Sequence, residues 1–150
     1  MMSRWQVRCL HASVIAITVT GAAFAIMKYA MKSDDPFAVI NHPWQPGMLA
    51  AHVIAAPFAV FAFGWIFGDH IWPSLTGRRP NRPTGVASML LIVPMALTGY
   101  FLQVVTGEQA HHWIGVAHWV TSGLFIVSYA AHLAFKPRPE KRNVSPRPAD

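Results

Sequence analysis

The chain has 150 residues, of which 53% are hydrophobic and only 12% are charged, and its formal net charge is +6. Soluble domains usually carry about 25% charged residues, so this composition excludes an ordinary soluble domain and indicates a membrane protein. The basic residues lie in loops and tails between apolar runs, which indicates membrane topology and argues against a nucleic-acid partner. Cys9 is the single cysteine, so the chain has no intrachain disulfide, cysteine-ligated cluster or covalently attached haem.

Four apolar runs are each long enough to cross a bilayer, which requires about 20 helical residues. In chain order they cover about 7–27, 46–72, 85–105 and 111–135. We therefore expect one all-α domain over residues 1–135, an integral membrane four-helix bundle. Residues 136–150 are basic and proline-rich, and we expect a disordered cytoplasmic tail. The first run also has features of a cleavable signal peptide, whose removal would discard His11.

The runs differ in their polar content. The second begins at Pro46, a favoured first-turn position, and contains Pro57, which should kink the helix. The third contains no histidine and no charge, which is typical of a packing helix, and its Gly85 and Gly99 lie fourteen residues apart. These glycines could leave room for flat cofactors, although ordinary close helix packing explains them equally well.

Lysine and arginine positions predict the orientation. Ten of the twelve fall at the two termini and in the connection between the second and third runs, whereas Lys28 and Lys32 lie in the first connection. Because positive charge accumulates on the cytoplasmic side, four spans with both termini in the cytoplasm satisfy this count.

Two histidines on the fourth run dominate the functional interpretation. His118 and His132 are fourteen residues apart, so they project from nearly the same helical face about 21 Å apart along the axis. An imidazole in hydrocarbon is costly unless it is paired or binds something. This spacing predicts two ligand positions, one near each membrane face.

Depth in the membrane then selects the partners of these histidines. His52 should match His118 near the outer face, and His11 should match His132 near the inner face. His70 competes with His11, but on a regular α-helix it lies about 27 Å from His52 and so too near the cytoplasmic surface. We therefore prefer His11 to His70.

A histidine within a membrane helix can also have a purely structural role. A single one often only bonds a neighbouring helix, so the prediction depends on four histidines at two matched depths. Three further histidines adjoin loops and are interpreted as interfacial or structural: His42, His111 and His112.

The chain resembles the bacterial di-haem cytochrome b membrane subunits, the group that includes cytochrome b561, the hydrogenase cytochrome b and the formate dehydrogenase gamma subunit. The resemblance spans about residues 5–136 and rests on RCLHASVIAITVTG, GMLAAHVIAAP and GVAHWVTSGLFIVSYAAHL. It implies four axial iron ligands, His11, His52, His118 and His132. They would hold two b haems, an outer one between His52 and His118 and an inner one between His11 and His132.

The resemblance further implies a multi-pass protein of the bacterial inner membrane that passes electrons between an extracytoplasmic redox partner and the quinone pool. It would serve as an electron-transfer subunit of a larger oxidoreductase complex, with the redox change on the iron. Because quinone reduction consumes protons, we consider Asp69 and His70 as a quinone or proton site, against the alternative of a plain helix terminus.

Two other functions remain open. The chain could be a small transporter that uses its histidines to bind a divalent metal or relay protons. It could also be a haem-free membrane anchor whose histidines only bond neighbouring helices.

Overall fold

The computed structural model describes residues 2–76 and 82–135. The predicted tail, 136–150, and part of the connection between the second and third runs, 77–81, lie outside the described residues. Within the described ranges the chain is all-helical, and four helices are long and apolar enough to cross a membrane. The prediction of an all-α chain with four helices of membrane-spanning length is therefore confirmed for the described residues.

The first span combines α1 (Arg4–Ala25) with a π-helical turn, η1 (Ile26–Ala30). It begins earlier than expected because Ser3 and Gln6 form a capping box. The Ser3 hydroxyl accepts a hydrogen bond from the Gln6 amide, and the Gln6 side chain accepts one from the Ser3 amide. This reciprocal cap satisfies two backbone donors that a helix start would otherwise leave without partners.

The second span is longer than expected and irregular near its end. It comprises α2 (Gln45–Ile66), a π-helical turn, η2 (Phe67–Ile71), and the short α3 (Trp72–Thr76). Pro46 lies in the first turn of α2, and the helix continues through Pro57. The π-helical turn is important below because its residues rise and rotate differently from those of an α-helix.

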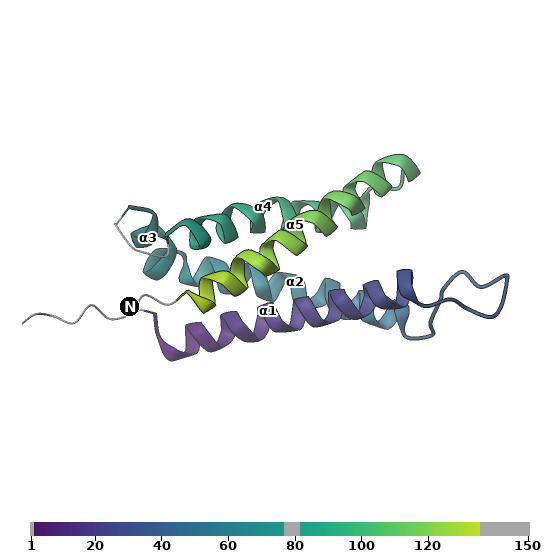
Figure 1. Ribbon diagram of the computed structural model, residues 1–150, viewed down its shortest axis with the longest axis horizontal. Helices are drawn as coiled ribbons and strands as arrows, with labels where there is room; N and C mark the ends of the chain where they lie inside the picture. The colour runs from purple at the N-terminus through teal and green to yellow at the C-terminus, as the bar shows by residue number, and fades with distance from the viewer. Residues whose placement is uncertain (1, 77–81, 136–150) are drawn as a thin grey trace, which may run out of the picture.

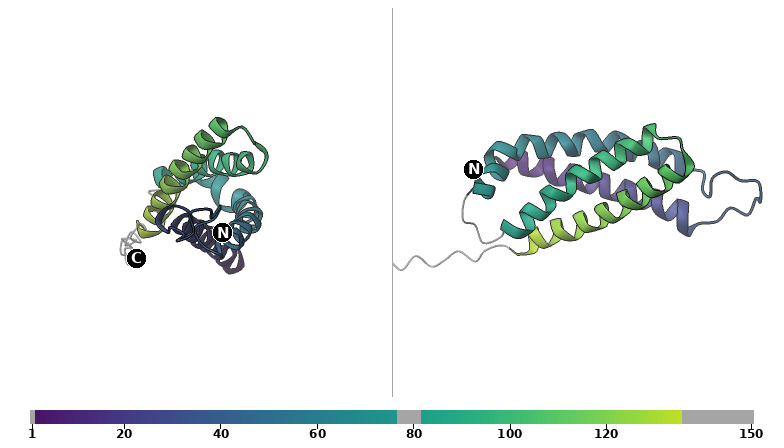
Figure 2. Two further views of the ribbon diagram at one scale, coloured as in Figure 1. Left: turned by 90° about the vertical axis from the view of Figure 1, so that its right-hand side faces the viewer. Right: turned by 90° about the horizontal axis from the view of Figure 1, so that it is seen from above.

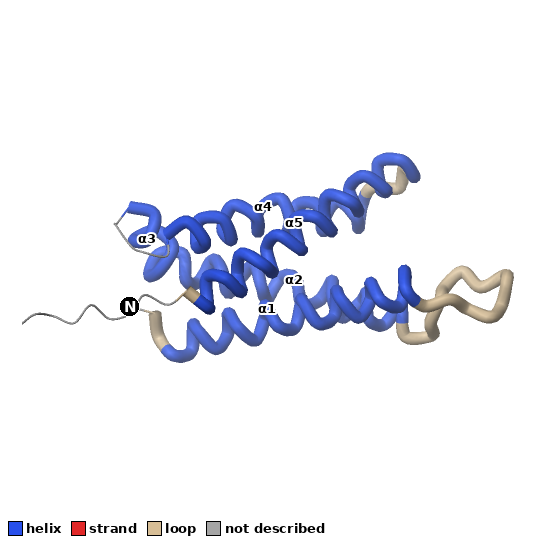
Figure 3. The backbone as a smooth tube through the Cα atoms, viewed as in Figure 1, coloured by secondary structure: helices blue, strands red, loops and turns tan. Residues whose placement is uncertain are grey.

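The spans form two hairpins. The first pairs α1 with α2, and the second pairs α4 (Arg82–Val104) with α5 (Glu108–Ala134). Helices pack closely within each hairpin, whereas contacts between the hairpins are sparse (Figures 1 and 2). The start of α1 and the end of α5 share one end of the bundle, the termini end. The connection 31–44 projects from the opposite end, the loop end (Figure 3).

A thin core joins the hairpins. Its buried residues are Leu10, Val14, Ala62, Ile66 and Phe125. Phe125 is only 2% exposed, and it lies seven residues from both His118 and His132 on α5. Most other large apolar side chains face outward, as expected for helices surrounded by lipid.

Candidate functional site: two histidine pairs between the hairpins

The loop-end pair joins His52 of α2 to His118 of α5. Their ring centroids are 6.2 Å apart, and the ring planes make an angle of 77°. The structure therefore brings together the two histidines that the sequence placed at matching depth near the outer face. One comes from each hairpin, so the pair spans the sparse interface between them.

The termini-end pair joins His70 of η2 to His132 of α5. Its geometry repeats that of the first pair, with centroids 6.2 Å apart and an interplanar angle of 69°. This differs from the expected pairing of His132 with His11. His11 instead places its Nδ1 2.7 Å from the hydroxyl of Tyr129, with the two rings edge to face.

The π-helical turn explains why the depth argument misplaced His70. The 27 Å separation from His52 assumed a regular α-helix, but His70 lies within η2. A π-helix closes its hydrogen bonds over five residues instead of four, so each residue advances less along the axis. The turn also changes the direction in which His70 projects, and its side chain can then reach the level of His132.

The Nδ1 atoms of the loop-end pair each contact the other helix of the same hairpin, α1 for His52 and α4 for His118. Nδ1 of His52 lies 3.0 Å from the carbonyl oxygen of Ile17 and 3.3 Å from the hydroxyl of Thr20 on α1. Nδ1 of His118 lies 3.0 Å from the carbonyl oxygen of Met95 and 3.2 Å from the hydroxyl of Thr98 on α4. Two unrelated helices thus present the same pair of acceptors.

These contacts fix the tautomer of both rings. A carbonyl oxygen can only accept a hydrogen bond, so Nδ1 of His52 and His118 must carry the proton. The threonine hydroxyls donate to carbonyls in their own helices, Ala16 and Pro94, so their oxygens can accept from Nδ1. In each neutral imidazole, Nε2 then keeps its lone pair, which is the state that a metal ligand requires.

Glycines clear the space that these rings occupy. A Cβ added at Gly21 would lie 2.8 Å from Cε1 of His52, and one added at Gly99 would lie 3.1 Å from Cε1 of His118. Any side chain at either position would displace the imidazole. Gly21 and Gly99 each follow the threonine that contacts the same histidine.

The termini-end pair has a related arrangement around His132. Its Nδ1 lies 3.2 Å from the hydroxyl of Thr84, and a Cβ added at Gly85 would lie 3.2 Å from its Cε1. The Thr-Gly dipeptides of α4 are therefore fourteen residues apart, the same interval as His118 and His132 on α5. The α4–α5 hairpin repeats one histidine-binding unit at both levels.

Sequence reasoning identified Gly85 and Gly99 but missed the threonines, Gly21 and Tyr129. The available signal was the Thr-Gly dipeptide, which occurs at 20–21, 84–85 and 98–99 inside apolar runs. Its fourteen-residue repeat matches that of the histidines. Tyr129 gave no comparable signal, because its contact with His11 depends on how the two hairpins are placed.

The spacing of the pairs fits an iron porphyrin held from both sides. A metal–imidazole bond is about 2.0–2.1 Å, and a ring nitrogen lies about 1.1 Å from its ring centre, so two such ligands have centroids roughly 6–6.5 Å apart. Both pairs show 6.2 Å. Direct edge-to-face contact between rings has a similar range of distances. In the loop-end pair the tautomer leaves His52 and His118 each with an Nε2 acceptor, so neither Nε2 can donate a hydrogen bond to the other ring.

The other predicted site residue, Asp69, makes a different contact. Its Oδ2 accepts a hydrogen bond of 2.8 Å from the Gln6 side chain, which ties α1 to η2 within the first hairpin. His42 bonds the Trp44 amide within the loop-end connection, and the ring of His112 lies against Trp113. Within residues 2–76 and 82–135, no group of three or more histidine, cysteine, aspartate or glutamate residues gathers as a metal site.

No protein-family model, curated protein or solved structure matches the chain.

Proposed function

We propose that this chain is an integral membrane electron carrier that holds two b-type haems between its hairpins. The loop-end haem has His52 and His118 as axial ligands, and the termini-end haem has His70 and His132. The observation that carries the proposal is the repetition of one geometry at two levels: T-shaped imidazole pairs with centroids 6.2 Å apart, contributed by opposite hairpins. Paired histidines in an apolar bundle are a known way to hold b-type haem.

The iron supplies the one-electron change, while the chain's residues hold the cofactor and exclude water. The Thr-Gly dipeptides fix the orientation of the His52, His118 and His132 rings, and hydrogen bonds from Nδ1 make these ligands more basic. Two redox centres stacked across the slab form a path for electrons between its faces. We infer that this path connects an extracytoplasmic redox protein with the quinone pool, within an oxidoreductase complex of the bacterial inner membrane.

The inner ligand set differs from the one expected from the family resemblance, which uses His11. The proposal prefers His70 because its ring centroid lies 6.2 Å from that of His132, whereas the ring of His11 lies against Tyr129. Asp69 and His70 are accordingly no longer proposed as the quinone site.

Absorption spectra and haem stoichiometry of the purified full-length protein test the proposal. We expect two b-type haems per chain. His52→Ala and His118→Ala should remove the same spectral component, and His70→Ala and His132→Ala should remove the other. His11→Ala should retain both haems, and His42→Ala is the matched control at a loop position.

Other results would contradict the proposal at different points. If the protein binds no haem even when it is expressed with excess haem, the haem-free membrane anchor is favoured. If it takes up a divalent metal and no haem, the transporter is favoured. Loss of the inner haem in His11→Ala but not in His70→Ala would restore the ligand set expected from sequence.

A further inference from the structure

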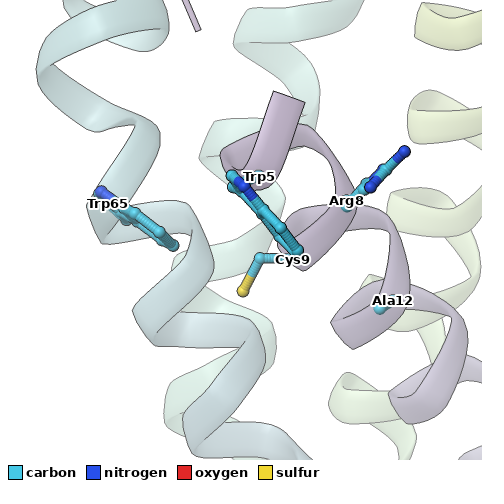
Figure 4. Close-up of a pocket in the computed structure, with 5 residues that line it drawn as sticks. All are labelled: Trp5, Arg8, Cys9, Ala12 and Trp65. Carbon is cyan, nitrogen blue, oxygen red and sulfur yellow. The ribbon is translucent and has the colours of Figure 1, made fainter. Parts of the chain in front are cut away.

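A groove lies between α1 and α2 at the termini end, beside the first turns of α1. Its volume is about 480 Å³, and it is lined by Trp5, Arg8, Cys9, Ala12 and Trp65. Figure 4 shows the two tryptophans on either side of Cys9. Trp5 is 72% exposed and Trp65 is 46% exposed, so these walls reach the surrounding lipid. The space between them suits a hydrocarbon chain, which gains contact with the walls and leaves no polar group unsatisfied.

Arg8 is the only charged residue that lines this groove. Its guanidinium is directed away from the gap between the tryptophans, so the aliphatic stem is the part that lines the groove (Figure 4). The guanidinium carbon lies 5.6 Å from the centroid of the Trp5 ring, a cation–π contact that keeps it beside the groove. No carboxylate of the described residues forms an ion pair with Arg8, so its N–H donors are available to an anion.

The charge around Arg8 is positive. Arg4 precedes it by four residues on α1, so both arginines lie on one face of the helix. Asp69 is the only carboxylate of α1 and the second span, and its Oδ2 is bonded by the Gln6 side chain. Gln6 is two residues from Arg8, which is about 200° around the helix, so this carboxylate is held on a different face of α1. An anion beside Arg8 therefore meets attraction from two guanidinium groups.

The Gln6 side chain also holds together the two helices that carry the groove walls. Its Nε2 lies 3.5 Å from the carbonyl oxygen of Trp65 and 2.8 Å from Oδ2 of Asp69, and Gln6 is only 5% exposed. The separation of α1 from α2 beside Trp65 is thus set by buried hydrogen bonds. A groove formed before its ligand arrives reduces the ordering cost of binding.

A second groove, between α1 and α5, lacks the charge. Its volume is about 230 Å³, and none of its eight lining residues is charged. It can contact a lipid chain, but it has nothing that selects a headgroup. It therefore serves as a comparison for the α1–α2 groove within the same molecule.

We propose that the α1–α2 groove binds an anionic phospholipid of the leaflet at the termini end, with one acyl chain between Trp5 and Trp65 and the phosphate on Arg8. A free phosphate would make no use of the apolar groove, and a neutral lipid would make no use of the arginines. Arginine binds phosphate through two parallel N–H···O bonds, and basic pockets between membrane helices bind anionic headgroups. Tryptophan is typical of the level where acyl chains meet headgroups.

The site is independent of the proposed haems. None of its lining residues is a proposed iron ligand, and no step of lipid binding involves a redox change. The inference therefore goes beyond the electron-carrier function and can be tested separately from it.

The test uses purified full-length protein, delipidated in detergent. Native mass spectrometry measures binding of dipalmitoyl phosphatidylglycerol, which is anionic, and of dipalmitoyl phosphatidylcholine, which has the same chains and no net charge. A phosphatidylglycerol with a diazirine in one acyl chain then labels the residues that line the site, and mass spectrometry identifies the labelled peptides. Far-ultraviolet circular dichroism checks that each variant is folded.

Two substitutions address the two parts of the site, each with a matched control. Arg8→Gln removes the charge, and Lys28→Gln removes another cation that lies over an aromatic ring, that of Tyr29 at 5.4 Å, at the loop end of the first span. Ala12→Trp fills the groove from an exposed position, and Ala130→Trp makes the same change at an exposed position of the uncharged α1–α5 groove.

We expect the parent to bind phosphatidylglycerol at least about 10-fold more tightly than phosphatidylcholine, and Arg8→Gln to reduce this preference by about 5–10-fold, the effect of one basic residue near a membrane surface. Arg8→Lys should reduce it less, because it keeps the charge and loses the paired bonds. Ala12→Trp should abolish labelling of residues 5–12 and 65. Both control variants should behave as the parent.

Three results would overturn the site: equal binding of the two lipids by the parent, an unchanged preference in Arg8→Gln, or labelling spread evenly over the helices. Displacement of the bound lipid by inorganic phosphate would also overturn it, because the acyl chain would then contribute nothing. A protein that shows the expected lipid preference but binds no haem would overturn the electron-carrier function and support this inference.

Discussion

At the scale of single residues, the glycines beside the histidines determine whether the rings can occupy their positions. A methyl group at Gly21 would lie 2.8 Å from the His52 ring, and one at Gly99 would lie 3.1 Å from the His118 ring. Contacts this short require the imidazole to move, and misplacing a ligand weakens the metal bond.

We expect Gly21→Ala and Gly99→Ala to weaken loop-end haem binding by about 10–100-fold while leaving the termini-end haem in place, an effect typical of disturbed outer-shell contacts. Gly21→Ala should have the larger effect because its contact is shorter. Haem titration followed by reduced-minus-oxidised spectra measures both. Gly64→Ala and Gly123→Ala are the controls, because an added Cβ at either meets nothing within 4 Å. If either variant weakened binding of both haems equally, its effect would not come from a contact specific to the loop-end histidines.

Thr98 tests the role of the second Nδ1 acceptor. Its hydroxyl lies 3.2 Å from Nδ1 of His118, whose other acceptor is the Met95 carbonyl. Removing the hydroxyl makes the imidazole a poorer electron donor, which favours ferrous over ferric iron. We expect Thr98→Val to raise the loop-end midpoint potential by up to about 60 mV, the shift equivalent to a tenfold change in relative affinity for the two states.

Redox titration measures the effect of Thr98→Val, and Thr121→Val on α5 is the control, since that hydroxyl bonds only carbonyls of its own helix. An unchanged or lowered potential would show that Thr98 does not tune the ligand.

At the scale of helices, the predictions from sequence succeeded where geometry is regular and failed where it is not. The four spans follow from hydropathy, and the match of His52 with His118 follows from depth on regular helices. The placement of His70 depended on η2, and no sequence feature distinguished that π-helical turn from an α-helix. The His11–Tyr129 bond depended on how α1 and α5 lie relative to one another, which apolar periodicity does not specify in a membrane.

Phe125 is the main residue of α5 that packs against the other hairpin. It is 2% exposed, and its ring centroid lies 5.8 Å from that of Phe63 and 5.7 Å from that of Tyr129. Phe→Ala in a soluble core costs about 3–5 kcal/mol, part of which is the cavity that remains. In a bilayer the transfer contribution is smaller because lipid is itself apolar.

We therefore expect Phe125→Ala to destabilise the detergent-solubilised protein by about 2–3 kcal/mol, near or below the lower end of that range. Thermal unfolding followed by circular dichroism and haem absorbance measures it. Phe58→Ala is the control, because Phe58 is 63% exposed on α2. A variant as stable as this control would show that the core between the hairpins contributes little.

At the scale of the whole molecule, the even number of long helices places the start of α1 and the end of α5 at the same end of the bundle. The distribution of arginine and lysine predicts that this end faces the cytoplasm. In a Cys9→Ser background, we expect Ser33→Cys in the loop-end connection to react with a membrane-impermeant thiol reagent in intact cells. Ser145→Cys should react only after the cells are opened. The reverse pattern would invert the orientation and place the His70–His132 pair near the extracytoplasmic face.

The sparse contact between the hairpins has a consequence for biogenesis. Each hairpin can enter the bilayer and form as a closely packed unit, but little in the polypeptide holds one hairpin to the other. The prosthetic groups would then complete the tertiary structure and act as its principal cross-links, so chains made under haem starvation should be loosely associated hairpins that are degraded quickly. The supply of haem would thereby control how much of the protein accumulates.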